Sequence, residues 1–176
     1  METQVRGRAW TFGDNISGDN GIIEFGMVRD YTKPYDEKAL AETCFKRIRP
    51  EFRSQVKEGD IVVGGRNFAH HNHPQVGVAI KACGIRAIVV ESTDTSFVRK
   101  SLNVGLPVLI APGVTQLIAD GEELEVDFAT GVVRNVTRGM SLTTKPYSAR
   151  MIAIWQSDGL VEYLRKTVDA VRVAAQ

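Results

Sequence analysis

The stretch GDIVVGGRNFAHHNHPQVGVAIKACGIRAIVVES, residues 59–92, decides the fold of this chain. It begins with a short apolar run of β-branched residues between glycines, which is typical of a buried strand. A helix is expected next, with Pro74 in its first turn, where a missing N–H costs nothing, and Gly84 at its end. Residues 85–92 form a second apolar run. This order of strand, helix and strand predicts a parallel sheet with a right-handed crossover.

The same alternation continues toward the C-terminus. Residues 96–105 predict a helix that ends at a glycine, and residues 107–111 predict a third strand. A hairpin is expected over 123–139, and a final helical stretch over 148–173 is interrupted near residues 158–159. The predicted class is therefore α/β, with a parallel βαβαβ core and added antiparallel strands.

The N-terminal part predicts a strand, a polar loop and a helix. Apolar and polar residues alternate in AWTFG at 9–13, which indicates a short strand. The loop after it is rich in Asp, Asn, Ser and Gly. Residues 35–49 have helical spacing of apolar residues, with Asp36 placed to cap the helix and Pro50 to end it.

Composition limits the possible partners. The 176 residues predict one domain, 1–176, and the net charge of +1 does not favour a nucleic-acid or membrane surface. No apolar run approaches the ~18 residues of a membrane span, and the N-terminus has no apolar segment typical of a signal peptide. We therefore expect a cytoplasmic protein. The two cysteines, Cys44 and Cys83, lie far apart in the sequence and predict buried thiols rather than a disulfide.

All three histidines of the chain, His70, His71 and His73, lie in one loop between a predicted strand and a predicted helix. Ligands of open α/β sheets bind at such strand ends, where the first N–H groups of the helix favour an anion. Three interpretations remain open: a metal site, polar residues that cap the helix, or an imidazole that acts as general acid or base. The loop has no Cys, Asp or Glu to complete a metal ligand set.

Several motifs occur in one collinear order across most of the chain: GDNISGDNGII at 13–23, GDIVVGGRNF at 59–68, ACGIRAIVVESTDTSFVRKSLNVGLPVL at 82–109, GVVRNVTRG at 131–139 and GLVEYLRK at 159–166. Together they resemble the small subunit of 3-isopropylmalate dehydratase, which is related to the swivelling C-terminal domain of aconitase. The resemblance implies a swivelling β/β/α domain in a heteromeric hydro-lyase. It also implies a large subunit as partner, which carries a [4Fe-4S] cluster on three cysteines, and a small hydroxy-carboxylic acid as substrate. Because this chain has two distant cysteines, we expect it to hold neither the cluster nor another metal.

The chain departs from the family pattern in the histidine-rich loop. After the asparagine and phenylalanine at 67–68 the family reads GxGSSRE, and this chain reads AHHNHPQ. By this alignment Ala69 and His71 replace glycines, and Asn72 replaces the serine that acts as base in the family. His73 replaces the second serine, and Pro74 replaces an arginine that binds a substrate carboxylate.

The altered loop suggests new roles for its residues. An amide cannot accept the proton, so His73 or His71 is the candidate base. Candidate substrate-binding residues are Asn72, Asp19, Arg66, His70 and Asn67, with Arg29 a further cation nearby. Asp19 aligns with the acid of the family's TD pair, although the acidic and polar residues of that loop could also simply hold a turn.

Two functions are compatible with these residues. The first is a hydro-lyase subunit that acts on an unusual hydroxy acid and is active only with its large subunit. The second is a non-catalytic partner or stabilising subunit that has lost the serine base. Hydration by a metal bound to the three histidines of this chain alone is a third, weaker hypothesis.

Overall fold

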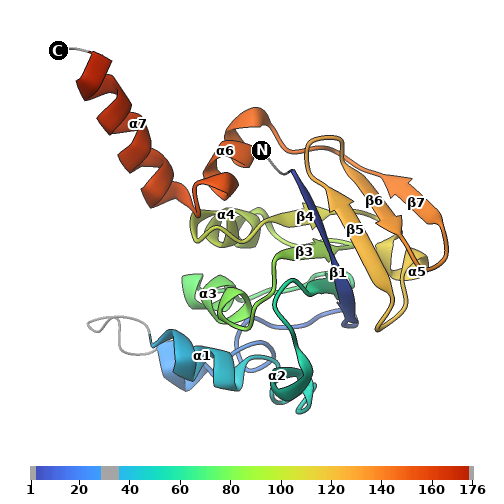
Figure 1. Cartoon of the computed structure of the whole chain (residues 1–176). Coiled ribbons are helices and arrows are strands. Elements are labelled where there is room, and N and C mark those ends of the chain that lie inside the picture. Colours follow the sequence, from blue (N-terminus) through green and yellow to red (C-terminus); the bar gives the residue numbers. More distant parts are fainter. Residues whose placement is uncertain (1–2, 29–35, 175–176) are drawn as a thin grey trace.

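The computed structural model describes residues 3–28 and 36–174 (Figure 1). A seven-stranded mixed sheet runs through the molecule in the order β4-β3-β2-β1-β5-β6-β7. The strands are β1 Gln4–Thr11, β2 Ile61–Gly64, β3 Ala87–Val90, β4 Val108–Ile110, β5 Glu123–Asp127, β6 Val132–Asn135 and β7 Met140–Thr143. The described helices are the 3₁₀ helix η1 Phe25–Val28 and the α-helices α1 Glu37–Thr43, α2 Phe52–Gln55, α3 Pro74–Ala82, α4 Thr95–Asn103, α5 Val114–Leu117, α6 Ala149–Gln156 and α7 Leu160–Ala174.

Strand β1 joins the two halves of the sheet. Its C-terminal residues Ala9–Thr11 pair in parallel with β2, and its N-terminal residues pair antiparallel with β5. Strands β2, β3 and β4 continue the parallel half, as the sequence predicts. The α/β class with a parallel core and added antiparallel strands is therefore confirmed. The sequence did not indicate that the strand at the N-terminus is central, nor that β7 extends the hairpin β5–β6 to a third strand.

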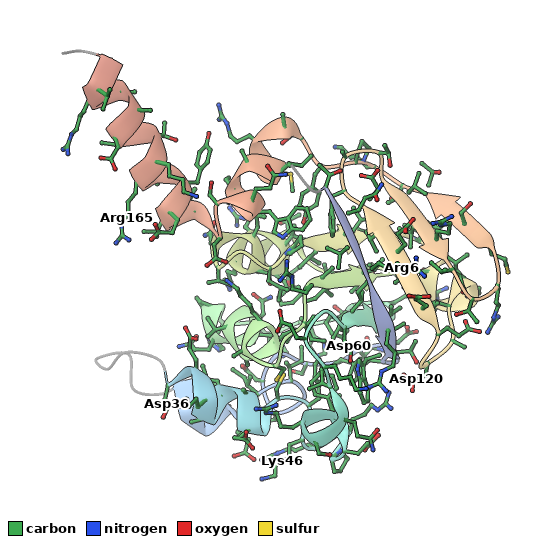
Figure 2. The ribbon with its side chains drawn as sticks, viewed as in Figure 1. Arg6, Asp36, Lys46, Asp60, Asp120 and Arg165 are labelled. Carbon is green, nitrogen blue, oxygen red and sulfur yellow. The ribbon has the colours of Figure 1, made fainter. Side chains whose placement is uncertain are left out.

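The predicted helix over 35–49 is partly wrong. Asp36 caps α1 as expected, because its Oδ1 accepts from the Ala39 N–H at 3.0 Å (Figure 2). The helix nevertheless ends at Thr43, well before Pro50. Phe45 is fully buried in a left-handed conformation, φ 56°, and its N–H donates to the Ile22 carbonyl at 2.8 Å. Burial of this ring and a bond to a distant loop outweigh the local helical pattern. Residue 35 lies outside the described residues.

Apolar side chains pack on both faces of the parallel strands, which explains the unbroken β-branched runs of the sequence. Val62 and Ile88 belong to the core cluster that α1 and α3 cover, whereas Ile61 and Val63 belong to the cluster on the opposite face. Helices α1, α2 and α3 lie together on one side of the sheet, as Figure 1 shows.

The two ends of the parallel strands differ. At the carboxyl ends, the loops after β1, β2 and β3 come together. At the amino ends, a cavity of about 1080 Å³ lies beside α7, lined by residues that include Glu58, Ile85, Gly105 and Tyr163.

The predicted break in the last helical stretch is confirmed, because Asp158 and Gly159 have φ of 64° and 112° between α6 and α7. Among the described helices, none is both long and apolar enough to cross a membrane.

Candidate active site

Two loops lie side by side at the carboxyl ends of β1 and β2. We call residues 13–23 the aspartate loop and residues 65–73 the histidine loop. Asp14 Oδ1 accepts from the Arg66 N–H at 2.7 Å, and the Asn67 amide donates to Asn15 Oδ1 at 3.1 Å. Farther along, the Gly18 N–H donates to the His70 carbonyl at 2.7 Å. These bonds continue the parallel pairing of the two strands into their loops and fix the loops relative to each other.

The histidine loop has an unusual backbone. Asn67, Ala69 and His71 have φ of 52°, 55° and 51°, so every second residue is left-handed. For residues other than glycine this conformation costs about 1–2 kcal/mol each. Ala69 and His71 are the two positions at which the family pattern has glycine, and the left-handed backbone gives a physical reason for that preference.

The fold brings His73 of the histidine loop against Asp19 of the aspartate loop. His73 Nε2 lies 3.3 Å from Asp19 Oδ2, and 29% and 19% of the two side chains remain exposed. His73 is the N-cap residue of α3, but its side chain makes no capping bond. The ring of Phe25 packs near the imidazole, with ring centroids 5.8 Å apart. The imidazole is therefore oriented by a carboxylate and remains accessible from outside.

Asp19 differs from the other polar residues of its loop. Asp14 and Asn15 hold the loop through bonds to the neighbouring loop. Within the described residues, the carboxylate of Asp19 has His73 as its only hydrogen-bond partner, and its buried Oδ1 has none. A buried acceptor without a partner costs about 1–3 kcal/mol. Holding a turn therefore does not account for Asp19, and unpaired groups of this kind occur at functional sites.

Asn72 faces away from this pair into the N-terminus of α4. Its amide donates to Asp94 Oδ2 at 3.1 Å and to Ser96 Oγ at 3.3 Å. Its Oδ1 and its backbone carbonyl accept from Lys100 Nζ at 2.9 and 2.8 Å. We call Asn72, Asp94, Ser96 and Lys100 the Asn72 cluster. The last three members were not predicted from the sequence, although Ser96 and Lys100 are four residues apart in a predicted helix and so share one face.

The other candidate residues lie around the same loop. His70 has Nδ1 3.2 Å from the Asn67 carbonyl, and its ring packs edge-on against that of His71, with centroids 4.9 Å apart. His71 and Arg66 are exposed, and the amide of Asn67 is engaged by Asn15. Contact of these residues with a substrate stays a prediction. Arg29 lies outside the described residues.

Two carboxylates after β3 support the neighbouring loops. Burial raises the pKa of Asp94. Bonds from the Ser96 hydroxyl, the Phe97 N–H and the Asn72 amide lower this pKa by a larger amount, so the net pKa is below its usual value. Burial raises the pKa of Glu91, but bonds from the Thr115 hydroxyl and from the N–H groups of Gly113 and Thr115 lower it by more, so its net pKa is also below its usual value. Both groups are thus held in the ionised form.

No cluster of three or more metal-binding side chains occurs in the described part of the chain. Cys44 and Cys83 are distant in sequence but interact with each other in the fold, and both are buried free thiols. Burial raises the pKa of the Cys44 thiol. Two thiols in an apolar core do not fit an iron–sulfur cluster, whose irons need several thiolates.

No protein-family model matches the chain. Curated relatives match nearly all of it. It is 39% identical over 170 residues to the methanogen homoaconitase small subunit of Methanothermobacter thermautotrophicus, covering 96% of this chain and 95% of the relative. It is 40% identical over 162 residues to the 3-isopropylmalate dehydratase small subunit of Pyrobaculum calidifontis, covering 92% and 97%.

A third relative and a solved structure agree with these two. The isopropylmalate/citramalate isomerase small subunit of Methanocaldococcus jannaschii is 36% identical over 169 residues, covering 94% of this chain and 96% of the relative. The crystal structure of a 3-isopropylmalate dehydratase (LeuD) from the same organism superposes with a TM-score of 0.86 at 30% identity, covering 98% of this chain and 99% of that one. The chain therefore belongs to the family of 3-isopropylmalate dehydratase small subunits, which are subunits of heteromeric hydro-lyases.

Proposed function

We propose that this chain is the small subunit of a hydro-lyase that adds or removes water from a non-standard hydroxy-carboxylic acid, with His73 as the base. Relatives that it matches over nearly their whole length are named as dehydratase, isomerase or homoaconitase small subunits. In this proposal residues 1–176 form one swivelling domain that closes over a large subunit in the cytoplasm. The large subunit carries a [4Fe-4S] cluster, which supplies the Lewis acid for the departing hydroxyl.

The observation that carries the proposal is the contact of His73 with Asp19. An ionised carboxylate only accepts hydrogen bonds, so Nε2 of His73 carries the proton shared with Asp19 Oδ2. In the neutral ring this leaves the lone pair on Nδ1, which has no partner within the described residues. Nδ1 is thus the atom that accepts the proton from the carbon next to a substrate carboxylate. A carboxylate that fixes the tautomer also stabilises the imidazolium that forms.

The position of His73 in the loop fits this role. The neighbouring Asn72, which aligns with the family's serine base, cannot accept a proton, and its amide is engaged by the Asn72 cluster. His73 follows it directly and faces Asp19. The Asn72 cluster then serves to fix the backbone from which His73 projects.

The substrate is expected to differ from those of the relatives. Pro74 stands where the family has an arginine, so the bidentate link to one substrate carboxylate is absent. The exposed groups that could replace it are His71 and Arg66, with His70 beside them. An imidazole cannot make the bidentate pair of bonds that a guanidinium makes with a carboxylate, and the guanidinium of Arg66 is on an exposed side chain. We therefore propose a hydroxy acid with a differently placed, or missing, second carboxylate.

The same observations define a second candidate. Replacement of the serine base by Asn72 and of the arginine by Pro74 is also what a subunit without catalysis would tolerate. Such a subunit would still bind and stabilise the large subunit. The orientation of His73 by Asp19, whose other oxygen is buried and unpaired, supports the enzyme instead.

The test is anaerobic co-expression with the large subunit, followed by assay of the purified complex. Formation or loss of the alkene is measured by absorbance over a panel of hydroxy and unsaturated mono-, di- and tricarboxylates. His73→Ala is expected to lower kcat about 10²–10⁴-fold, the usual contribution of a general base, without loss of co-purification. The matched variant His71→Ala removes a neighbouring imidazole and is expected to raise KM with little change in kcat.

Each other result changes the assignment. Turnover by His73→Ala at the wild-type rate would remove His73 from the mechanism. A stable wild-type complex that is inactive on the whole panel would favour the non-catalytic subunit. A metal bound by this chain alone, lost in the His70, His71 and His73 variants, would favour the metal hypothesis.

A further inference from the structure

The two cysteines of the chain meet where helices α1 and α3 end. Cys44 is the C-cap residue of α1, and Cys83 is the C-cap residue of α3. The two helices lie side by side on one face of the sheet (Figure 1). Cys44 and Cys83 belong to the same core cluster, with 0% and 5% of the two residues exposed. The fold therefore brings together two free thiols that are distant in the sequence.

A single backbone carbonyl holds both residues in place. The Ala41 carbonyl accepts from the Cys44 N–H at 3.2 Å and from the Cys83 thiol at 3.6 Å. The Cys44 thiol in turn donates a hydrogen bond to the sulfur of Cys83. The two sulfur atoms are thus already in contact in the folded chain. Only a small movement is needed to bring them to the distance of a disulfide bond, about 2.05 Å.

The two thiols differ in reactivity. A hydrogen bond from the Cys44 thiol lowers the pKa of Cys83, and this effect exceeds that of burial, which raises it. The charge of Arg53 lowers the pKa of Cys83 further, and that of Glu42 raises it. Burial instead raises the pKa of the Cys44 thiol. Because the thiolate is the nucleophile, Cys83 is the cysteine that reacts first with a small oxidant.

We propose that Cys83 and Cys44 form a reversible disulfide when the chain meets hydrogen peroxide, with Cys83 as the reactive cysteine and Cys44 as the resolving one. The Cys83 thiolate attacks one peroxide oxygen, the O–O bond breaks, and the departing hydroxide takes up a proton to become water. The sulfur of Cys44 then attacks the sulfenic sulfur of Cys83. The S–O bond breaks as the S–S bond forms, and the hydroxide leaves with the Cys44 proton as a second water. Two thiols are oxidised to one disulfide, and the peroxide takes up both electrons.

The disulfide would close a loop around the segment that carries the histidine loop. Residues 45–82 include β2, the histidine loop and α3. The bond ties α1 to α3, the helix that begins directly after His73. A cross-link of this kind stabilises the fold mainly because it restricts the unfolded chain. In a reducing compartment such a bond is transient and reports oxidation. This reaction does not depend on the proposed hydro-lyase activity, and its test needs no turnover.

The test uses the full chain, purified with reductant, transferred to buffer without it and treated with hydrogen peroxide. Alkylation under denaturing conditions is expected to find two free thiols before treatment and none afterwards, in a monomer whose mass is lower by two hydrogens. The tryptic peptides that contain Cys44 and Cys83 are expected to stay linked until dithiothreitol is added. The melting temperature is expected to rise by about 5–15 °C on oxidation and to return with dithiothreitol.

Single variants separate the roles of the two cysteines. In Cys44→Ala, peroxide is expected to leave a sulfenic acid on Cys83, which dimedone labels. In Cys83→Ala, Cys44 is expected to remain a free thiol, because it is fully buried and its pKa is raised. Circular dichroism verifies that each variant keeps its helix content.

A charge variant tests the environment of Cys83. Arg53→Gln is expected to slow the loss of free thiols about 2–5-fold, as fits a partly exposed charge that is shared with Glu42. Arg165→Gln makes the same substitution on α7, far from the cysteines, and is expected to leave the rate unchanged (Figure 2).

Three results would overturn the proposal. The first is a wild-type chain that keeps two free thiols in peroxide that fully oxidises glutathione. The second is a disulfide that joins two chains instead of two residues of one monomer. The third is a rate of thiol loss that does not rise with the peroxide concentration, because unfolding, and not the folded pair, would then limit the reaction.

Discussion

The histidine loop and helix α7 lie at opposite ends of the parallel strands and are built by opposite means. The histidine loop is held by hydrogen bonds from the aspartate loop and from α4, and Phe68 anchors it with no exposed surface. Helix α7 keeps its apolar side chains in solvent. The first region fixes a few polar atoms at defined distances, as chemistry requires. The second leaves surface to be buried by something else, as assembly requires.

The largest expected effect concerns the one carboxylate that faces His73. In the Asp19→Asn variant, an uncharged amide favours the Nε2–H tautomer of His73 less strongly than the carboxylate does. Turnover of the complex is therefore expected to fall about 10²–10⁴-fold. The amide keeps a polar atom at the buried and unpaired position but carries no charge, so thermal stability is expected to stay close to that of the wild type. Asp14→Asn is the matched control, since its amide oxygen can still accept from the Arg66 N–H. A drop in melting temperature without loss of turnover would make Asp19 structural.

A pair of core and surface truncations sharpens the contrast in folding energy. Phe68 packs against the rings of Phe12, Phe45 and Phe97 beneath the histidine loop. Phe68→Ala is expected to reduce the free energy of unfolding by about 3–5 kcal/mol. Leu164→Ala, at an exposed position of α7, is expected to change the free energy of unfolding by less than about 0.5 kcal/mol in dilute solution. Urea unfolding measures both, and equal losses would mean that α7 packs on the domain in solution.

The Asn72 cluster is the polar counterpart of that core. Asn72→Ala leaves Lys100 and Asp94 without their amide partner, and a loss of about 1–3 kcal/mol in the free energy of unfolding is expected. Asn103 is exposed at the end of α4, the helix that contains Lys100. Asn103→Ala is the control, and its free energy of unfolding is expected to stay within about 0.5 kcal/mol of the wild-type value. If both variants are equally stable, the cluster does not hold the loop.

A smaller effect is expected at the left-handed residue His71. Glycine removes a strain of about 1–2 kcal/mol there, but it adds about 0.5–1 kcal/mol of backbone entropy to the unfolded state. His71→Gly is therefore expected to stabilise the chain by no more than about 1 kcal/mol, whereas β-branched His71→Val is expected to destabilise it. Melting temperatures rank the three proteins. A valine variant as stable as the glycine variant would mean that the loop does not hold this backbone in solution.

The smallest effect is the acid dependence that Asp94 contributes. Its pKa is lower in the folded state than in the unfolded chain, so the folded state binds fewer protons. The stabilisation is complete above the ordinary range near about pH 4 and is lost as the pH falls toward the folded-state pKa. Asp94→Asn is expected to lose stability less steeply between about pH 5 and 3. Parallel acid curves for the two proteins would exclude Asp94 as a source of that slope.

The helix predicted over 35–49 shows where a local sequence pattern fails to predict the structure. The apolar spacing is that of a helix, but the ring of Phe45 is buried against distant aromatic residues, and its N–H bonds to Ile22. Neither partner can be identified from nearby residues. The short helices α2 and α5 and strand β7 were also missed. Each has only four residues and lacks the unbroken β-branched run by which the equally short strands β2 and β3 were recognised.

The sequence assigned the candidate site residues to particular loops, but it did not indicate which of them pair. The sequence put His73 in a strand-to-helix loop and Asp19 in a polar loop, 54 residues earlier. It did not indicate that these two meet while Asn72 turns toward Asp94. Which side chain of a loop faces which neighbour depends on backbone angles such as the φ of 51° at His71. Residue types at these positions do not specify those angles.

The sequence by itself determined the parallel core, the break between α6 and α7, and the family, because these depend on periodicity, glycine positions and motif order along the chain. Only the tertiary structure decided that β1 is central, that Asp19 contacts His73, and that apolar side chains of α7 stay exposed. Each of these depends on contacts between residues far apart in sequence. The free energy of such contacts comes from burial and hydrogen-bond geometry that exist only after the chain has folded.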